Sequence, residues 1–172
     1  MKKLPNKLVK DYVLKFFGYG SWKANIWFVG MEEGGSDNVR DVEGRLKVWK
    51  KQGGHFLSDC KSIHFKRGEV RWHDASAKGI QRTWKNLIRM YLLAHGKKDT
   101  REYILDFQPN EFGKRRGSTC SMELFPLPSP NVATWNYGKW SDWHWLKSRR
   151  EYEAEVIKKM DTSFTSCEAR VQ

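Results

Sequence analysis

The stretch NIWFVGMEEGG, residues 25–35, sets an unbroken apolar run directly before two carboxylates and two glycines. The apolar run, Ile26 to Gly30, is typical of a strand that is buried on both faces in a parallel sheet covered by helices. In such sheets the functional crevice lies beyond the carboxyl ends of the strands, and glycines there let the backbone approach a ligand closely. Glu32 and Glu33 are therefore candidate catalytic residues, although an ordinary solvated turn has the same composition.

A second apolar run, Cys120 to Phe125, leads into a segment that contains Pro126, Pro128 and Pro130. Proline lacks the backbone N–H that the interior of a strand needs, so we expect the strand to end at Phe125. The sequence therefore predicts two buried strands, each of which stops abruptly at a segment suited to binding.

Apolar residues at helical spacing predict helices around these strands. The predicted ranges are Pro5 to near Gly18, 38–51, 78–95, 99–108 and 149–160. Residues 54–76 show no clear period, and GYGSWKAN, residues 18–25, reads as a loop. The order of elements predicts an α/β fold with three layers, in which a short, mostly parallel sheet is flanked by helices. Strands 26–30 and 120–125 should pair in parallel, with helix 78–95 packed across them.

The length of 172 residues fits one domain, 1–172, whose polar tail 161–172 we expect to be frayed. No stretch approaches the roughly 20 apolar residues that span a bilayer, and the basic N-terminus has helical spacing unlike a secretory signal. The three cysteines, Cys60, Cys120 and Cys167, form no C-x-x-C motif. They predict reduced thiols in a cytoplasmic protein, with neither disulfides nor a zinc site.

The chain is strongly basic, with a net charge of +12, and it contains nine tryptophans and nine phenylalanines. Basic side chains attract phosphate backbones, and exposed rings offer faces on which unpaired bases stack. Two clusters are candidate contacts with a nucleic-acid backbone: Lys114, Arg115 and Arg116, and then Lys147, Arg149 and Arg150. The alternative is solvated loop charge together with tryptophans that belong to the core.

The stretches IWFVGMEEGG (26–35) and MELFPLPSPN (122–131) resemble the first two strand-end motifs of the uracil-DNA glycosylase superfamily. The similarity extends over roughly residues 12–160, and these two stretches carry it. The resemblance implies a four-stranded parallel sheet with helices on both faces. It also implies a nucleic acid or nucleobase as ligand and the hydrolysis of an N-glycosidic bond as activity.

In that superfamily the loop after the first strand carries an acidic or amide side chain that positions the attacking water. The developing oxocarbenium ion needs nearby negative charge, and the water needs an acceptor. The resemblance gives this role to Glu32 or Glu33, with Glu32 preferred. The residues expected to contact the ligand are Gly30, Met31, Gly34 and Gly35 after the first strand, Pro126, Leu127, Pro128, Ser129 and Asn131 after the second, and Trp135 or Tyr137 as a stacking ring.

Active members of the superfamily end with a further strand and a His-Pro-Ser-like motif that holds the departing base. Here no histidine is followed by proline, so the chain resembles only the first two-thirds of the pattern. His64, His73 and Asp74 could share a metal ion, but they lack a recognised metal-ligand spacing. We therefore interpret His64 and His73 as surface histidines in a basic loop, and neither a metal nor a cofactor is predicted.

Two functions from different classes remain open. The first is a glycosylase-like domain that binds nucleic acid or a nucleobase at the ends of its strands. The second is a non-enzymatic homo-oligomeric interaction module. Two strands leave apolar surface and sheet edges to be covered, which predicts a two-fold homodimer. The aromatic segment from Trp135 to Trp145 and the final helix near Tyr152, Val156 and Ile157 are the candidate contact.

Overall fold

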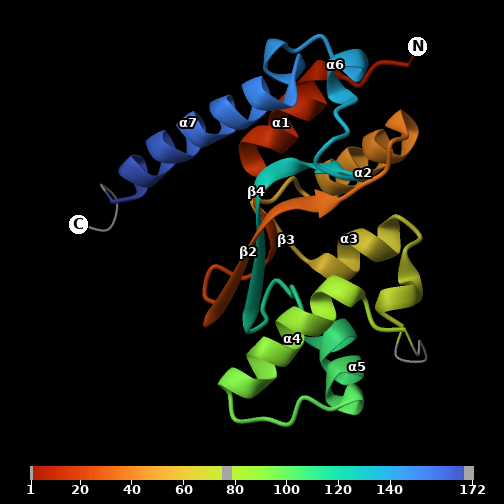
Figure 1. The fold of residues 1–172 in the computed structure, drawn as a ribbon, viewed down its shortest axis with the longest axis vertical. Helices are drawn as coiled ribbons and strands as arrows, with labels where there is room; N and C mark the ends of the chain where they lie inside the picture. Colours follow the sequence, from red (N-terminus) through yellow and green to blue (C-terminus); the bar gives the residue numbers. More distant parts are fainter. Residues whose placement is uncertain (1, 75–78, 169–172) are drawn as a thin grey trace.

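The protein adopts an α/β fold, as its sequence predicts, with a short, mostly parallel sheet flanked by helices (Figure 1). The structure, a computed structural model, describes residues 2–74 and 79–168, with side chains as far as residue 159. The strands are β1 (Gly18–Gly20), β2 (Ile26–Gly34), β3 (Leu57–Ser58) and β4 (Thr119–Ser129). The α-helices are α1 (Asn6–Lys15), α2 (Val39–Lys51), α3 (Cys60–Lys66), α4 (Arg82–Ala94), α5 (Arg101–Asn110), α6 (Tyr137–Trp140) and α7 (Arg149–Glu168), with 3-10 turns η1 (Val70–Trp72) and η2 (His144–Leu146).

The two long strands form the centre of the fold. The sheet has the order β2-β4-β1-β3, and β2 pairs with β4 in parallel from Ile26↔Thr119 to Gly30↔Glu123. Helix α4 packs against this pair because Phe28 of β2 shares one apolar cluster with Ile88 and Leu92. The predicted parallel pairing and the helical crossover are both confirmed.

Strand β1 corrects the prediction of a loop over residues 18–25 at residues 18–20, while residues 21–25 belong to no helix or strand. It runs antiparallel to β4 and parallel to β3, so the sheet is mixed. A Cβ atom on Gly18 would lie 2.1 Å from the carbonyl oxygen of Ser121, and one on Gly20 would lie 2.3 Å from that of Thr119. Both glycines also have positive φ, at 139° and 120°. Glycine therefore marks a close approach of two strands here, whereas the sequence pattern predicts a loop.

Both long strands extend further than predicted. β2 continues through Glu32 and Glu33 to Gly34, and β4 continues through the prolines to Ser129. The ladder shifts register between the pairs Glu32↔Phe125 and Gly34↔Ser129. Pro126 and Pro128 fall within this irregular stretch, where a missing N–H breaks no ladder hydrogen bond.

The main core joins the two ends of the described chain. Leu4, Val9 and Tyr12 lie in one apolar cluster with Tyr152 and Val156. The same cluster contains Tyr137, Trp140 and Trp143, each no more than 7% exposed. These three rings of the predicted dimer contact therefore belong to the core of the single chain, whereas Ile157 of the same predicted contact is 52% exposed.

Helix α7 is longer than the predicted 149–160, and residues 169–172 of the predicted frayed tail lie outside the described residues. Of the helices in the described ranges, none combines the length and the apolar character required to cross a membrane.

Candidate functional site

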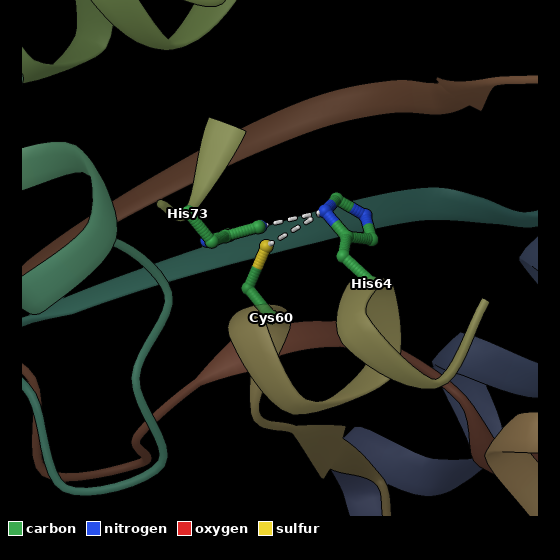
Figure 2. Close-up of side chains that lie close together, drawn as sticks. All are labelled: Cys60, His64 and His73. Atoms are coloured by element: carbon green, nitrogen blue, oxygen red, sulfur yellow. Dashed lines mark hydrogen bonds between the residues drawn. The ribbon is translucent and has the colours of Figure 1, made fainter. Parts of the chain in front are cut away.

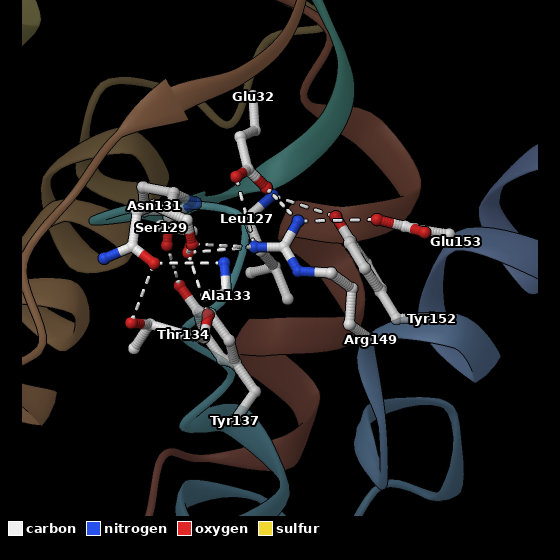
Figure 3. Close-up of polar contacts among 11 residues, drawn as sticks. Glu32, Leu127, Ser129, Asn131, Ala133, Thr134, Tyr137, Arg149, Tyr152 and Glu153 are labelled. Atoms are coloured by element: carbon white, nitrogen blue, oxygen red, sulfur yellow. Dashed lines mark hydrogen bonds and ion pairs between the residues drawn. The ribbon is translucent and has the colours of Figure 1, made fainter.

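The two carboxylates at the end of β2 point to opposite sides of the strand, as successive residues of a strand do. Glu32 forms a bidentate ion pair with Arg149 at the start of α7, with Oε–Nη distances of 2.8 and 3.1 Å (Figure 3). Glu33 instead contacts Arg45 of α2, with 2.7 Å between Oε2 and Nη1. The two residues therefore have different environments and different roles.

Glu32 links β2 to the end of β4. Arg149, its partner, also donates hydrogen bonds to Ser129 Oγ at 3.0 Å and to the carbonyl oxygen of Asn131 at 3.2 Å (Figure 3). Paired arginine–carboxylate contacts of this geometry are strong and directional. Because both of its oxygens are engaged, Glu32 is a less suitable base than the sequence preference implied.

Glu33 is held as an anion by several donors. Tyr19 Oη donates to its carboxylate at 3.0 Å, and His64 Nε2 lies 3.7 Å from its other oxygen. Burial by itself would raise the pKa of Glu33, but the Arg45 guanidinium and His64 outweigh it and lower the pKa to about 2. The negative charge of Glu33 is therefore present across the physiological pH range.

Glu123 of β4 is a further acidic group at this position, and it was not among the residues predicted from the sequence. Its carboxylate lies beside Gly30, where an added Cβ would come within 2.9 Å of Oε2. Burial raises the pKa of Glu123 to about 8, and the charges of Glu33 and Glu32 add to the rise while Arg45 opposes it. The available signal was a charged residue in the middle of the apolar run MELF.

A cavity of about 500 Å³ joins these acidic groups at the carboxyl end of β2 and the middle of β4. Its lining residues are Glu32, Glu33 and Gly34 of β2, Glu123 of β4, Arg45, His64, the segment 68–72, Gln81, Thr83 and Trp84. The walls thus combine the ionised carboxylate of Glu33 and the protonated carboxyl group of Glu123 with cations and two tryptophans. Much of this lining comes from residues 54–76, where the sequence shows no clear period.

The predicted ligand-binding residues separate into several groups. Gly34 lines the cavity and Gly30 lies beside Glu123, whereas the Met31 side chain is 58% exposed. Gly35 packs against Pro128, and its N–H donates to the carbonyl oxygen of Ser129 at 2.9 Å.

The prediction that Glu32–Gly35 and Pro126–Asn131 line one cleft is therefore corrected: Glu32, Glu33 and Gly34 line the cavity without residues 126–131, and Gly35 contacts Pro128 and Ser129 directly. Pro126, Leu127, Pro128 and Ser129 are buried, and Asn131 is exposed.

The two rings expected to stack on a ligand are engaged within the protein. Tyr137, labelled in Figure 3, is 2% exposed. Its hydroxyl donates to the carbonyl oxygen of Pro128 at 2.7 Å. Trp135 lies 5.0 Å from the ring of Tyr152, and the guanidinium of Arg149 covers it at 5.3 Å. Neither ring lines the cavity.

The two predicted basic clusters also differ. The first cluster lines a second cavity of about 1220 Å³ with Lys114, Arg115 and Arg116, and Lys23 lies in the same lining. Two aromatic residues also line it, Trp22 and Phe56, which are 52% and 51% exposed. In the second cluster Arg149 is committed to Glu32, while Lys147 and Arg150 are exposed. The first cluster therefore combines cations with open rings, and the second does not.

A group of possible metal ligands lies next to Glu33. Cys60, His64 and His73 are buried and their ligand atoms converge (Figure 2). Burial raises the pKa of the Cys60 thiol, and burial together with His64 lowers the pKa of His73 to about 3. The prediction of surface histidines is therefore wrong, because helix α3 and turn η1 could not be recognised from residue periodicity.

Comparison of the chain with protein-family models, with curated proteins and with solved structures finds no match.

Proposed function

We propose that this chain is a glycosylase-like domain that binds a nucleobase or nucleotide in the cavity between the end of β2 and Glu123 of β4 and hydrolyses an N-glycosidic bond there. One observation carries the proposal: two acidic residues with opposed pKa shifts, Glu33 and Glu123, line the same cavity. Pairs of titratable groups whose surroundings separate their pKa values are typical of acid–base chemistry.

The chemistry assigns one role to each group. As the bond between the sugar carbon and the base nitrogen breaks, its electron pair goes to the base, and Glu123 protonates the base nitrogen. The negative charge of Glu33 stabilises the oxocarbenium ion left on the sugar. A water oxygen then bonds to the sugar carbon, and the proton that the water loses passes to the ionised Glu123, which restores its protonated form.

The cavity suits a base by size and composition. About 500 Å³ is within the range of small-ligand pockets, and Trp72 and Trp84 supply an aromatic wall. Trp84 is fixed by stacking on His64 at 5.6 Å, whereas Trp72 is partly exposed and carries Arg71 on its ring at 4.3 Å. Trp72 is thus the ring best placed to contact a bound base.

Nucleic-acid strands are proposed to follow the second cavity. Lys114, Arg115 and Arg116 would contact phosphates, and the exposed rings of Trp22 and Phe56 would stack on unpaired bases. Sequence-tolerant binding of single strands uses this combination of cations and aromatic faces.

Release of a free base from oligonucleotides that carry unmodified or deaminated bases tests the proposal, with alkaline cleavage at abasic positions as readout. Glu123→Gln should lower the rate by about 10²–10⁴-fold, because the proton donor is lost while shape is kept. Glu102→Gln, at an exposed position of α5 outside the cavity, should have no effect. If oligonucleotides and nucleosides neither react nor bind, the proposal is wrong.

A second candidate function, a homo-oligomeric interaction module, is favoured by the edge of the sheet. β2 is an edge strand in the described sheet, and Trp27, Val29 and Met31 on one face of it are 43%, 59% and 58% exposed. Long apolar edge strands invite pairing with another strand. We propose a second copy as the partner, because two-fold pairing of β2 with itself would bring the same stripe together.

A further inference from the structure

Three buried side chains outside the proposed chemistry point their ligand atoms at one another (Figure 2). His64 Nδ1 lies 2.8 Å from His73 Nε2 and 3.9 Å from Cys60 Sγ, and all the ligand atoms lie within 4.8 Å. The exposed fractions of Cys60, His64 and His73 are 0%, 5% and 1%. A solvent-exposed cluster would form by chance more often than one enclosed in this way.

The local structure explains why the three groups meet. Cys60 and His64 are four residues apart on α3, so they project from the same face of the helix. His73 follows turn η1, which folds the chain back over that face. The sequence signal is therefore C-x-x-x-H on a helix with a histidine nine residues further on, in place of a C-x-x-C spacing.

We propose that Cys60 Sγ, His64 Nδ1 and His73 Nε2 bind one zinc-class divalent metal ion. One thiolate and two imidazoles are borderline-soft ligands that suit Zn²⁺. Binding releases the thiol proton of Cys60, because thiolate is the ligating form. The three described ligands leave the fourth tetrahedral position for water.

The spacing of the ligand atoms fits a tetrahedral ion. With Zn–N near 2.0–2.1 Å and Zn–S near 2.3 Å, two nitrogens lie about 3.3 Å apart and a nitrogen and a sulfur about 3.6 Å apart. The distances here are 2.8 and 3.9 Å, so each differs by about half an ångström or less. Small side-chain rotations remove such a difference.

His64 has the environment of a metal-bound histidine. Its Nε2 faces carboxylate oxygens of Glu33 at 3.7 Å and Glu69 at 4.0 Å, which favours the proton on Nε2 and leaves the Nδ1 lone pair facing the cluster. A carboxylate behind the ligating imidazole orients the ring and increases its basicity. Trp84 fixes the same ring by parallel stacking, with an interplanar angle of 7°.

The position of the ion gives it a structural role. It would join α3 to the chain after η1 and so hold the segment 68–72 that lines the cavity. It would also fix His64 beneath Glu33. The inference does not depend on the proposed function, since metal binding is measured without a substrate.

Cobalt substitution tests the site. The full chain is stripped of metal with a chelator under reducing conditions and titrated with Co²⁺ and then Zn²⁺. We expect about one Co²⁺ per chain, a thiolate-to-cobalt charge-transfer band, tetrahedral visible bands and displacement by Zn²⁺. Cys60→Ala should abolish the charge-transfer band, and His73→Gln should weaken binding at least tenfold. Cys120→Ala, which removes a buried thiol outside the cluster, should leave both unchanged.

Two results would overturn the proposal. The first is a native wild-type chain that binds no Co²⁺ or shows no thiolate band, and this measurement holds even if a variant fails to fold. The second is an unchanged spectrum in folded Cys60→Ala, which would place the ion elsewhere.

Discussion

Arg45 of α2 and Glu33 of β2 form an ion pair with 2.7 Å between Nη1 and Oε2, and the Arg45 side chain is 5% exposed. An arginine so deeply buried depends on its partner, because an unpaired charge in this position would lose its hydration without compensation. The pair also attaches α2 to the end of β2, since Arg45 Nη2 donates to the carbonyl oxygen of Gly34 at 3.3 Å.

Arg45→Met should therefore lower the free energy of unfolding by about 3–5 kcal/mol, as breakage of a buried pair does. The double variant Glu33→Gln/Arg45→Met should recover much of this loss, because no lone charge remains. Chemical denaturation followed by circular dichroism measures both. Arg40→Met, on the exposed side of the same helix, should change stability by less than about 0.5 kcal/mol. An Arg45 variant as stable as the Arg40 variant would contradict the prediction.

Glu123 should make stability depend on pH. In the folded protein its pKa is about 8, whereas the reference value is 4.5, so the folded state keeps a proton that the unfolded chain releases. The associated stability is fully present below about pH 4.5 and is lost as pH rises to about 8. Glu123→Gln has no such proton, so its stability relative to wild type should rise by about 1–3 kcal/mol between pH 5 and 8. Unfolding curves at several pH values test this, and a constant difference would contradict it.

The glycines of β1 should not tolerate a methyl group. Gly18→Ala should destabilise the fold by several kcal/mol, because its Cβ would lie 2.1 Å from the carbonyl oxygen of Ser121 at a φ of +139°. The matched control is Gly44→Ala in the middle of α2, where a Cβ atom would have no neighbour within 4 Å among the described residues. That change should stabilise the protein by about 0.5–1 kcal/mol through helix propensity. Thermal unfolding compares the two, and equal effects would argue against the close β1–β4 contact.

The second cavity should determine the salt dependence of nucleic-acid binding. Lys114→Gln/Arg115→Gln/Arg116→Gln should weaken single-strand binding and reduce the slope of log K against log salt by about 2, because each phosphate that is no longer neutralised accounts for roughly 0.7 of the slope. Lys85→Gln/Lys97→Gln/Lys98→Gln removes the same charge from exposed positions elsewhere. Fluorescence anisotropy at several salt concentrations distinguishes them, and identical slopes would exclude a specific basic groove.

Self-association, if it occurs through β2, should depend on the exposed stripe. Val29→Lys/Met31→Lys should abolish a dimer seen by light scattering, because charges would face each other across the strand pair. Val132→Lys, at a position that is 74% exposed, is the control. A wild-type chain that stays monomeric at high micromolar concentration would remove the dimer proposal.

The fold was predictable where apolar periodicity was strong. The run Ile26 to Gly30 and the helix around Ile88 indicated the parallel strand pair and its covering helix. The expected burial of the run on both faces is wrong, because β2 is an edge strand of the described sheet and Trp27 and Val29 are exposed. β1 was missed because a strand of three residues, Gly18–Gly20, has no period to detect. The site was only partly predictable. The position of Glu33 after a buried apolar run predicted that it lies at the end of a strand, whereas tertiary packing brings Glu123 and Arg45 to the same cavity. No sequence pattern states that a carboxyl group at residue 123 lies beside Gly30.

The end of β4 is secured by side chains from later in the chain. The N–H of Leu127 donates to Tyr152 Oη at 2.9 Å, and Tyr137 Oη donates to the carbonyl oxygen of Pro128. Arg149 donates hydrogen bonds to both Ser129 and Glu32. A nascent chain that has left the ribosome only as far as β4 therefore contains the strand, but it cannot yet form these hydrogen bonds. During synthesis the carboxyl end of β4 should remain susceptible to proteases until α7 has emerged. Of the cavity residues, Glu32 would then gain its Arg149 contact only late in the folding of this protein.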